Sequence, residues 1–413
     1  MVSDTKENKQ AKQSITDDKR EVFFKDISKI NSPLVDILKD DDIEEIMINS
    51  NINIFVFSRS FGSKKIDFKL SSEDLDKIVK LIISNCGRNF DKREFIDGIL
   101  PDGSRVNVVS KNLTNDYVIT IRKFLKAQLT IIDLILNNTL TASMAAYLWT
   151  ITEGFRIKPV NIFVCGGSGT GKTSLLNVII NFINPMERLV VVEDTRELDL
   201  SLFENSVSLV SDISNPDSLA NITINTLRMR PDRIIIGEVR GREVQSLFAA
   251  MDTGHDGCMA TLHSNNSTDV ITKLMSKPMD IPEVSINLLD VIVMLKKEFH
   301  NNKLKRYVSQ ITEVTRIGNI NLNDIYAINN ATESEDIRIM NSSVLEHYTD
   351  LINITKSQIK IVIDVRAEVL EGLCDKQRAG KIFVGSELKN EVFTNPEYSY
   401  QKILGIDTNN NKK

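Results

Sequence analysis

The chain has little of what builds zinc, redox or membrane-spanning sites. It has four cysteines, nine prolines and one tryptophan among 413 residues. The cysteines are widely scattered and form no C-x-x-C pair, which excludes a zinc ribbon and a dithiol redox motif. No uninterrupted apolar run approaches the length of a membrane span, and the N-terminus carries no signal-peptide apolar region. We therefore expect a cytoplasmic protein with reduced thiols.

Positive charge is also not in excess. The chain has 51 Lys and Arg residues against 56 Asp and Glu, for a net charge of −5. This balance gives no global reason to expect a nucleic-acid partner, so no direct contact with nucleic acid is expected. The single tryptophan, Trp149, argues against a channel that stacks single-stranded bases. Ordinary hydrophobic (41%) and charged (26%) contents fit two or three globular domains.

A complete phosphate-binding pattern, G-x-x-x-x-G-K-[ST], stands near the middle of the chain. Its residues are Gly166, Gly167, Ser168, Gly169, Thr170, Gly171, Lys172 and Thr173. An apolar run at 160–164 precedes it, and a helix-like stretch from Ser174 follows it. This strand–loop–helix context predicts that residues 166–174 bind the phosphates of ATP at a helix N-terminus. Lys172 is expected to reach the β- and γ-phosphates, and the Thr173 hydroxyl to bind Mg²⁺.

Two acidic residues follow predicted strands downstream. Glu193 ends a strand at 189–192, and Glu238 follows a strand at 234–236. One acidic residue after a strand is usually a helix cap. Parallel sheets, however, bring ligands to the carboxyl ends of their strands, and here two carboxylates accompany a phosphate loop. We expect both to orient the attacking water or hold Mg²⁺ through its waters, with Glu238 as the first candidate for the catalytic base.

Histidines and arginines cluster close to these carboxylates. His255 and His263 lie eight residues apart, which is not a metal-ligand spacing on a helix. Structural roles are the ordinary alternative, but a histidine at a nucleotide site can sense the γ-phosphate or pair with a carboxylate. Arg240 lies two residues after Glu238 and is a candidate for stabilising phosphoryl charge. Its neighbours in this cluster are Arg228, Arg230, Arg233 and Arg242.

The organisation predicted along the chain is α/β throughout. We expect a disordered tail at 1–20, a small α/β domain at 21–125, a helical connection at 126–155, an ATPase domain at 156–327 and an extension at 328–413. Apolar spacing predicts a helix at 71–86 begun by Ser71, and another at 358–374. The extension is thin in apolar residues and is expected to pack on the ATPase domain or to dock a partner. A chain ending near Asn330 is therefore expected to keep its ATP affinity.

Several strings resemble the type II/type IV secretion ATPases. Residues 227–241 (LRMRPDRIIIGEVRG) are similar to the second nucleotide motif of that family, 192–195 to its acidic box and 254–264 to its histidine box. Residues 42–49, 100–107 and 120–124 look like the CpaF-like branch, the motors of tight-adherence (Tad) pili. The chain lacks the four-cysteine zinc insert of the type II motors. The C-terminal extension matches no part of the family that we can place.

This resemblance implies a RecA-like P-loop NTPase domain with a smaller N-terminal, PAS-like sensor domain. It implies a homo-hexameric, Mg²⁺-dependent ATPase with ATP between the two domains, where Arg105 and Arg122 match the arginines that reach the phosphates. It also implies a place at the inner face of the cell membrane, on an inner-membrane platform protein, driving pilus assembly, retraction or secretion.

Three other functions remain open from the sequence. A conjugation-type traffic ATPase would move DNA or protein substrates with the same motifs. A RecA-like DNA motor fits the P-loop and the glutamate but not the acidic net charge. A nucleotide-binding regulator with little turnover is disfavoured because Lys172, Thr173 and Glu238 are all present.

Overall fold

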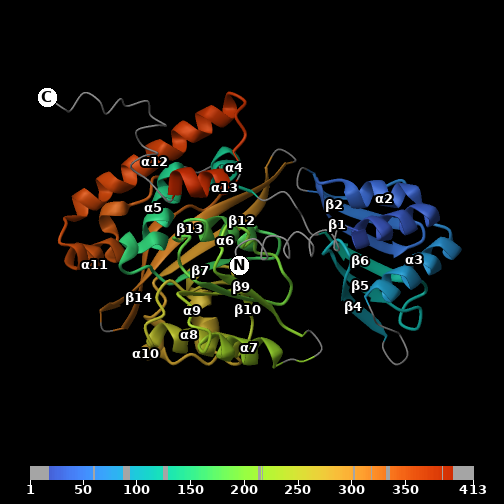
Figure 1. The fold of residues 1–413 in the computed structure, drawn as a ribbon, viewed down its shortest axis with the longest axis horizontal. Helices are drawn as coiled ribbons and strands as arrows, with labels where there is room; N and C mark the ends of the chain where they lie inside the picture. Colours follow the sequence, from blue (N-terminus) through green and yellow to red (C-terminus); the bar gives the residue numbers. More distant parts are fainter. Residues whose placement is uncertain are drawn as a thin grey trace, which may run out of the picture. The chain divides into compact units, whose positions relative to one another are not determined.

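The computed structural model of the protein describes residues 18–58, 61–86, 94–123, 129–212, 215, 217–300, 303–317, 319–331, 335–383 and 385–393 (Figure 1). The chain forms two compact units. One comprises residues 1–127 and 299–304, and the other 128–298 and 305–413. The predicted domain boundary at 125 lies outside the described residues. Most of the tail predicted to be disordered also lies outside them, but residues 18–20 already belong to a helix.

The first unit is an antiparallel sheet covered by helices. Its strands pair in the order β3-β2-β1-β6-β5-β4. Their bounds are β1 Ile43–Ser50, β2 Asn53–Ser58, β3 Gly62–Lys65, β4 Phe95–Ile99, β5 Arg105–Val109 and β6 Val118–Arg122. Alternate residues of these strands share one core with helices α2 (Ser32–Lys39) and α3 (Ser72–Asn85). The predicted cap of α3 is confirmed, because the Ser71 side chain accepts a hydrogen bond from the Asp74 amide at 3.0 Å.

The second unit is built on a mostly parallel sheet, as a RecA-like domain requires. The strand order is β14-β13-β12-β7-β11-β10-β8-β9, with parallel pairing from β12 to β9 and an antiparallel β13–β14 pair. The bounds are β7 Ile162–Gly166, β8 Leu189–Glu193, β9 Ser206–Val210, β10 Arg233–Val239, β11 Met259–His263, β12 Val291–His300, β13 Lys303–Ile317 and β14 Asn319–Ala327. Every residue of β7 and β8 is buried, which matches their continuous apolar sequence.

Helices cover both faces of this sheet (Figure 1). One face packs on α7 (Ser218–Thr226), α8 (Glu243–Asp252), α9 (Ser267–Met275) and α10 (Glu283–Ile286). The core on the other face takes side chains from α4 (Ile131–Leu136), α5 (Ala142–Glu153), α6 (Lys172–Ile180), α11 (Ser343–Ile352) and α12 (Lys356–Arg378). Helix α12 packs on α4 and α5, and the short α13 (Gly385–Glu387) has no buried residue. Among the helices that the structure describes, none combines the length and the apolar character that a bilayer crossing needs.

Segments on both sides of the predicted ATPase domain are part of its core. The predicted connection at 126–155 contains α4 and α5, whose apolar residues share a core with β7 and α6. The extension after residue 328 adds α11 and α12 to the same core, including buried Leu345, Ile359 and Leu370. Packing of the extension on the ATPase domain is thus confirmed. The sequence analysis expected a chain ending near Asn330 to keep its ATP affinity. That expectation assumed an intact ATPase domain, whereas the cut would remove part of its core.

A buried ion pair joins α12 to α5. Arg366 donates to the carboxylate of Glu153 and, at 3.1 Å, to the Thr150 hydroxyl, and its guanidinium lies 4.6 Å from the centre of the Trp149 ring. Burial lowers the pKa of Arg366, while the Glu153 charge opposes that shift. Arg156 also lies 3.7 Å from the other carboxylate oxygen of Glu153. Among the described residues, removing Arg366 would therefore leave the buried Glu153 carboxylate with Arg156, at 3.7 Å, as its cationic neighbour.

We predict that Arg366→Met lowers the free energy of unfolding by about 3 kcal/mol, because it leaves Glu153 buried without its main partner. The control is Arg378→Met on the same helix, whose exposed pair with Asp375 should cost about 1 kcal/mol or less. Urea unfolding of both variants measures the difference. Equal losses would show that the α12–α5 pair is not a stability determinant.

Candidate active site

Parallel pairing brings the predicted site residues to one edge of the second sheet. In register, His263 at the end of β11 lies opposite Gly166 at the end of β7. Val192 of β8 pairs with Ile236 of β10, so Glu193 and Glu238 lie close to the same edge. Four strands thus deliver the phosphate loop, a histidine and two carboxylates to one place, where α/β proteins bind their ligands.

The phosphate loop has the backbone shape that its glycines permit. Gly166, Gly169 and Gly171 have φ angles of +155°, +68° and +93°. A Cβ at Gly166 would lie 2.5 Å from the Leu295 carbonyl oxygen, so no other residue fits there. Gly171 is the N-cap of α6, and among the described side chains none caps the helix there. The first amides of α6 therefore face the loop, where an anion can accept from them.

Lys172 is the first residue of α6 and is 7% exposed. Its amine donates to the Gly167 carbonyl oxygen at 3.0 Å and lies 3.3 Å from both ring nitrogens of His263. The Thr170 hydroxyl donates to the same Gly167 carbonyl at 3.0 Å. Ser168 lies in the loop between them, and Thr173 and Ser174 follow Lys172 in the first turn of the helix.

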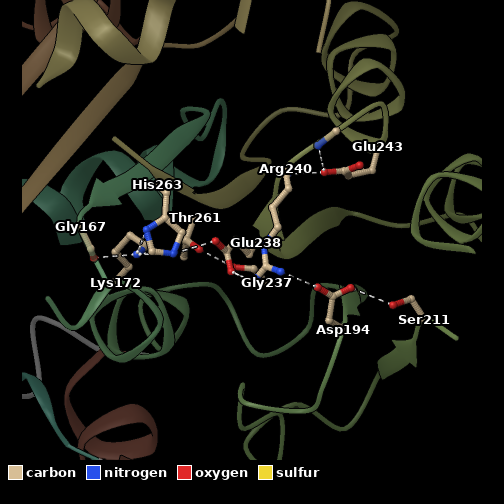
Figure 2. A network of polar contacts seen from close by, with 11 residues as sticks. Gly167, Lys172, Asp194, Ser211, Gly237, Glu238, Arg240, Glu243, Thr261 and His263 are labelled. Atoms are coloured by element: carbon tan, nitrogen blue, oxygen red, sulfur yellow. Dashed lines mark hydrogen bonds and ion pairs between the residues drawn. The ribbon is translucent and has the colours of Figure 1, made fainter. Parts of the chain in front are cut away.

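A chain of polar contacts continues from Lys172 across the edge (Figure 2). His263 Nε2 lies 3.0 Å from one carboxylate oxygen of Glu238, and Arg240 donates to the other. Arg240 lies 3.7 Å from Asp194, which in turn accepts from the Ser211 hydroxyl at 2.8 Å. Along this chain of contacts, each of the two carboxylates, Glu238 and Asp194, therefore lies beside the cationic Arg240.

The surroundings of Glu238 keep it ionised. Burial alone would raise the pKa of this carboxyl, but the hydrogen bond and charge of Arg240, helped by His263 and Lys172, bring the pKa below its ordinary value. The pKa of His263 is lowered by burial and by the Lys172 charge, against the opposing effect of Glu238. At neutral pH the site therefore combines a carboxylate with a neutral imidazole, which can accept or donate a proton.

Glu193 organises the loop that follows β8. It is 2% exposed, and one of its carboxylate oxygens accepts from the amides of Glu197 (2.9 Å) and Leu198 (3.0 Å). A Cβ at Gly237 would lie 2.9 Å from Glu193 Cγ, so β10 can approach this side chain only with glycine at that position. These contacts favour a loop-holding role for Glu193 over proton transfer.

The structure does not bring all predicted residues to this edge. His255 precedes β11, at the amino end of the strand, and its ring lies 3.3 Å from the Thr253 hydroxyl and the Ala250 carbonyl. Its position within the subunit therefore does not support the prediction that it binds nucleotide. Arg233, one of the arginines predicted to flank this strand, begins β10 and pairs with Glu187 at the end of the strand opposite Glu238.

Arg105 and Arg122 belong to the first unit. They lie directly opposite each other on β5 and β6, and Glu45 of β1 is the next residue in the same row. Directly opposite residues share a face of a sheet, and the buried Val106 and Ile121 beside them occupy the other face. Both arginines thus lie on the sheet face away from the helices α2 and α3.

Two residues near the phosphate loop were missed by the sequence analysis. Arg306 donates to the Gly169 carbonyl oxygen at 2.9 Å, and the Lys297 amine lies 3.0 Å from the place of a Cβ on Gly169. Both belong to the β12–β13 hairpin, which is rich in lysine. The basic run was visible in the sequence, but nothing local in it indicated that β12 pairs with the P-loop strand.

We predict that Gly237→Ala lowers ATP turnover at least roughly tenfold, because the added methyl displaces Glu193 and the loop it holds. The control is Gly385→Ala, whose Cβ would make an ordinary 3.6 Å contact with Leu202. Steady-state hydrolysis by both variants gives the comparison. Unchanged turnover in Gly237→Ala would mean that the position of Glu193 does not matter to the site.

Comparison with known proteins places these features in a family. The family model described as "Type II/IV secretion system protein" matches residues 28–366. An uncharacterized protein of Methanocaldococcus jannaschii is 42% identical over 233 residues, 54% of this chain and 32% of that protein. A second from the same organism is 31% identical over 67% of this chain and 50% of its own length. The chain thus spans only a third to a half of these two relatives.

Other relatives match over more of their length. A probable conjugal transfer protein TrbB of Sinorhizobium fredii is 29% identical over 68% of this chain and 86% of its own. The structure of the Yersinia pseudotuberculosis ATPase DotB superposes with a TM-score of 0.50 at 16% identity, covering 92% of this chain and 93% of that one. The fold is therefore shared with that ATPase. The family match covers most of the sequence, and the chain belongs to the type II/IV secretion system protein family.

Proposed function

We propose that this chain is a Mg²⁺-dependent ATPase, with its site at the carboxyl edge of β7, β11 and β10. The single observation that carries the proposal is the contact chain from Lys172 through His263 to Glu238 beside the P-loop. Two of the groups that Lys172 contacts are neutral, the Gly167 carbonyl and the His263 ring. The β- and γ-phosphates of ATP would be stronger partners because they carry charge.

In this proposal Glu238 is the general base for the attacking water. It is ionised at neutral pH, and a carboxylate has about four acceptor sites, so it can accept from a water while His263 and Arg240 hold it. Arg240 fixes the carboxylate and contributes positive charge beside the phosphates. His263 contacts both Lys172 and Glu238. A phosphate that binds Lys172 would therefore change the contacts of His263, which is a neighbour of the base.

The residues at this edge fit Mg²⁺ through a hydroxyl and through water. Thr173 in the first turn of α6 supplies a hydroxyl oxygen of the kind that Mg²⁺ prefers. Both oxygens of Glu238 contact other side chains, and an oxygen of Glu193 accepts two amides. These carboxylates are thus better placed to bind the water molecules that coordinate Mg²⁺ than to bind Mg²⁺ directly. When bound, Mg²⁺ would neutralise charge on the phosphates.

We predict that Glu238→Gln keeps ATP affinity within about threefold and lowers turnover by roughly a hundredfold or more, since the near-isosteric amide cannot accept the proton. Lys172→Ala serves as the matched binding-site variant and should abolish tight binding. Calorimetry with a non-hydrolysable ATP analogue and a phosphate-release assay measure both quantities. Turnover within a few-fold of wild type in Glu238→Gln would remove Glu238 as the base and make Glu193 the candidate.

We also propose that the ATPase is a homo-hexameric motor in which Arg105 and Arg122 reach the phosphates when domains close. The pair of neighbouring arginines, on a sheet face without the core helices, supports this role because two fixed charges there suit a polyphosphate. An arginine on a moving domain would contact the γ-phosphate only in the closed state, which couples hydrolysis to motion.

We predict that the chain forms a ring and that nucleotide favours it. Analytical sedimentation with and without ATP and Mg²⁺ tests this, with Lys172→Ala as the control that cannot respond to nucleotide. A fully active monomer at high concentration with nucleotide would contradict both the hexamer and the role of the two arginines.

The machine served by this motor has two candidates. The CpaF-like strings favour a Tad-like pilus, with the motor in the cytoplasm, peripheral to the inner face of the cell membrane on a platform protein. The relatives named as conjugal transfer proteins favour a conjugation-type traffic ATPase equally well. Neighbouring genes for a platform protein and a prepilin peptidase would support the first, and conjugation genes the second.

A further inference from the structure

The hairpin of β12 and β13 extends beyond the sheet edge beside the P-loop. In register, Leu295 of β12 lies opposite Gly166, the last residue of β7, and β12 continues for five residues to His300. Four lysines and arginines of the second unit lie on this extension and on β13, namely Lys296, Lys297, Lys305 and Arg306. The phosphate loop therefore has a basic strand pair as its neighbour.

Arg306 contacts the P-loop in two places. Its Nε donates to the Gly169 carbonyl oxygen at 2.9 Å, and its Cδ lies 3.7 Å from the place of a Cβ on Gly171. The side chain thus spans the turn that ends at the N-cap of α6. Lys297 approaches the same turn, with its amine 3.0 Å from the place of a Cβ on Gly169.

These contacts have a direct consequence for phosphate binding. A peptide group whose carbonyl is held by Arg306 has a fixed orientation, and so has the amide of the next residue, Thr170. The P-loop binds phosphate with successive backbone amides, so a fixed peptide orientation lowers the cost of ordering the loop around the ligand. The charges of Arg306 and Lys297 also make the potential at the loop more positive.

We propose that Arg306, assisted by Lys297, is a positioning residue that holds the P-loop of this chain in its phosphate-binding conformation. The inference rests on the proposed ATPase function, and it adds a residue from the far side of the loop to the set formed by Lys172, His263 and Glu238. Arg306 acts through the Gly169 peptide, so its loss should weaken nucleotide binding more than it slows the chemical step.

Three substitutions separate this role from packing and from charge. Arg306→Met keeps the aliphatic stem beside Gly171 and removes the donor and the charge. Arg306→Lys keeps the charge and one donor. Lys305→Ala is the matched control, because Lys305 is an exposed neighbour on the same strand and its loss changes the net charge equally. Affinity for ATP and ADP, the separate kcat and KM values, and the melting temperature are measured for each.

We expect Arg306→Met to weaken the binding of both nucleotides roughly tenfold, with kcat at saturating ATP within about threefold of wild type. Arg306→Lys should recover part of the affinity, and Lys305→Ala should stay within about twofold of wild type. The melting temperatures of Arg306→Met and Lys305→Ala should agree, which shows that the loss of affinity is not a loss of folding.

Three results would overturn the inference. Equal affinities in Arg306→Met and Lys305→Ala would show that Arg306 does not act on the loop. A fall in kcat with unchanged KM and affinity would place Arg306 in the chemical step instead. A lower melting temperature that accounts for the lost binding would show that Arg306 stabilises the fold instead of positioning the loop. A separate outcome concerns the proposed function: if the wild-type chain binds no nucleotide, or binds it no more tightly than Lys172→Ala does, the ATPase proposal fails and this inference fails with it.

Discussion

The parallel pairing of β7, β11, β10 and β8 is the constraint on which the site depends. These strands come from segments up to about a hundred residues apart in the chain, and they meet only because each pairs in register with the next. Register places Gly166 opposite His263, and the neighbouring pairs bring Glu238 and Glu193 to the same edge. A shift of one residue in any of these strands would turn its functional side chain to the other face of the sheet.

Charge compensation holds the site together once the strands have placed it. Glu238 is partly buried, and a carboxylate there is stable because Arg240 pairs with it and Lys172 lies beyond His263. The neutral imidazole between Lys172 and Glu238 keeps the cation and the anion apart while contacting both. This arrangement leaves the lysine with partners that a phosphate can replace and leaves the carboxylate ionised.

Local signals predicted the parts of this structure that depend on neighbours in sequence. The P-loop, the acidic residues at strand ends and the Ser71 cap were all visible because glycine spacing, strand composition and capping chemistry act over a few residues. The contact of Arg306 with the phosphate loop was not visible, since it depends on which strand pairs with β7. The integration of α12 into the core was also underestimated, because part of its buried surface is the aliphatic stem of Arg366, which an apolar count omits.

On nucleotide binding, we expect Lys172 to exchange its contacts with Gly167 and His263 for phosphate, while Glu238 keeps Arg240. A crystal structure of the chain with Mg²⁺ and a non-hydrolysable ATP analogue measures this directly. We expect to find the Lys172 amine at the β- and γ-phosphates, away from the Gly167 carbonyl oxygen. Glu238 should still pair with Arg240 and face the γ-phosphate. Nucleotide bound elsewhere, or bound while Lys172 stays on Gly167 and His263, would contradict it.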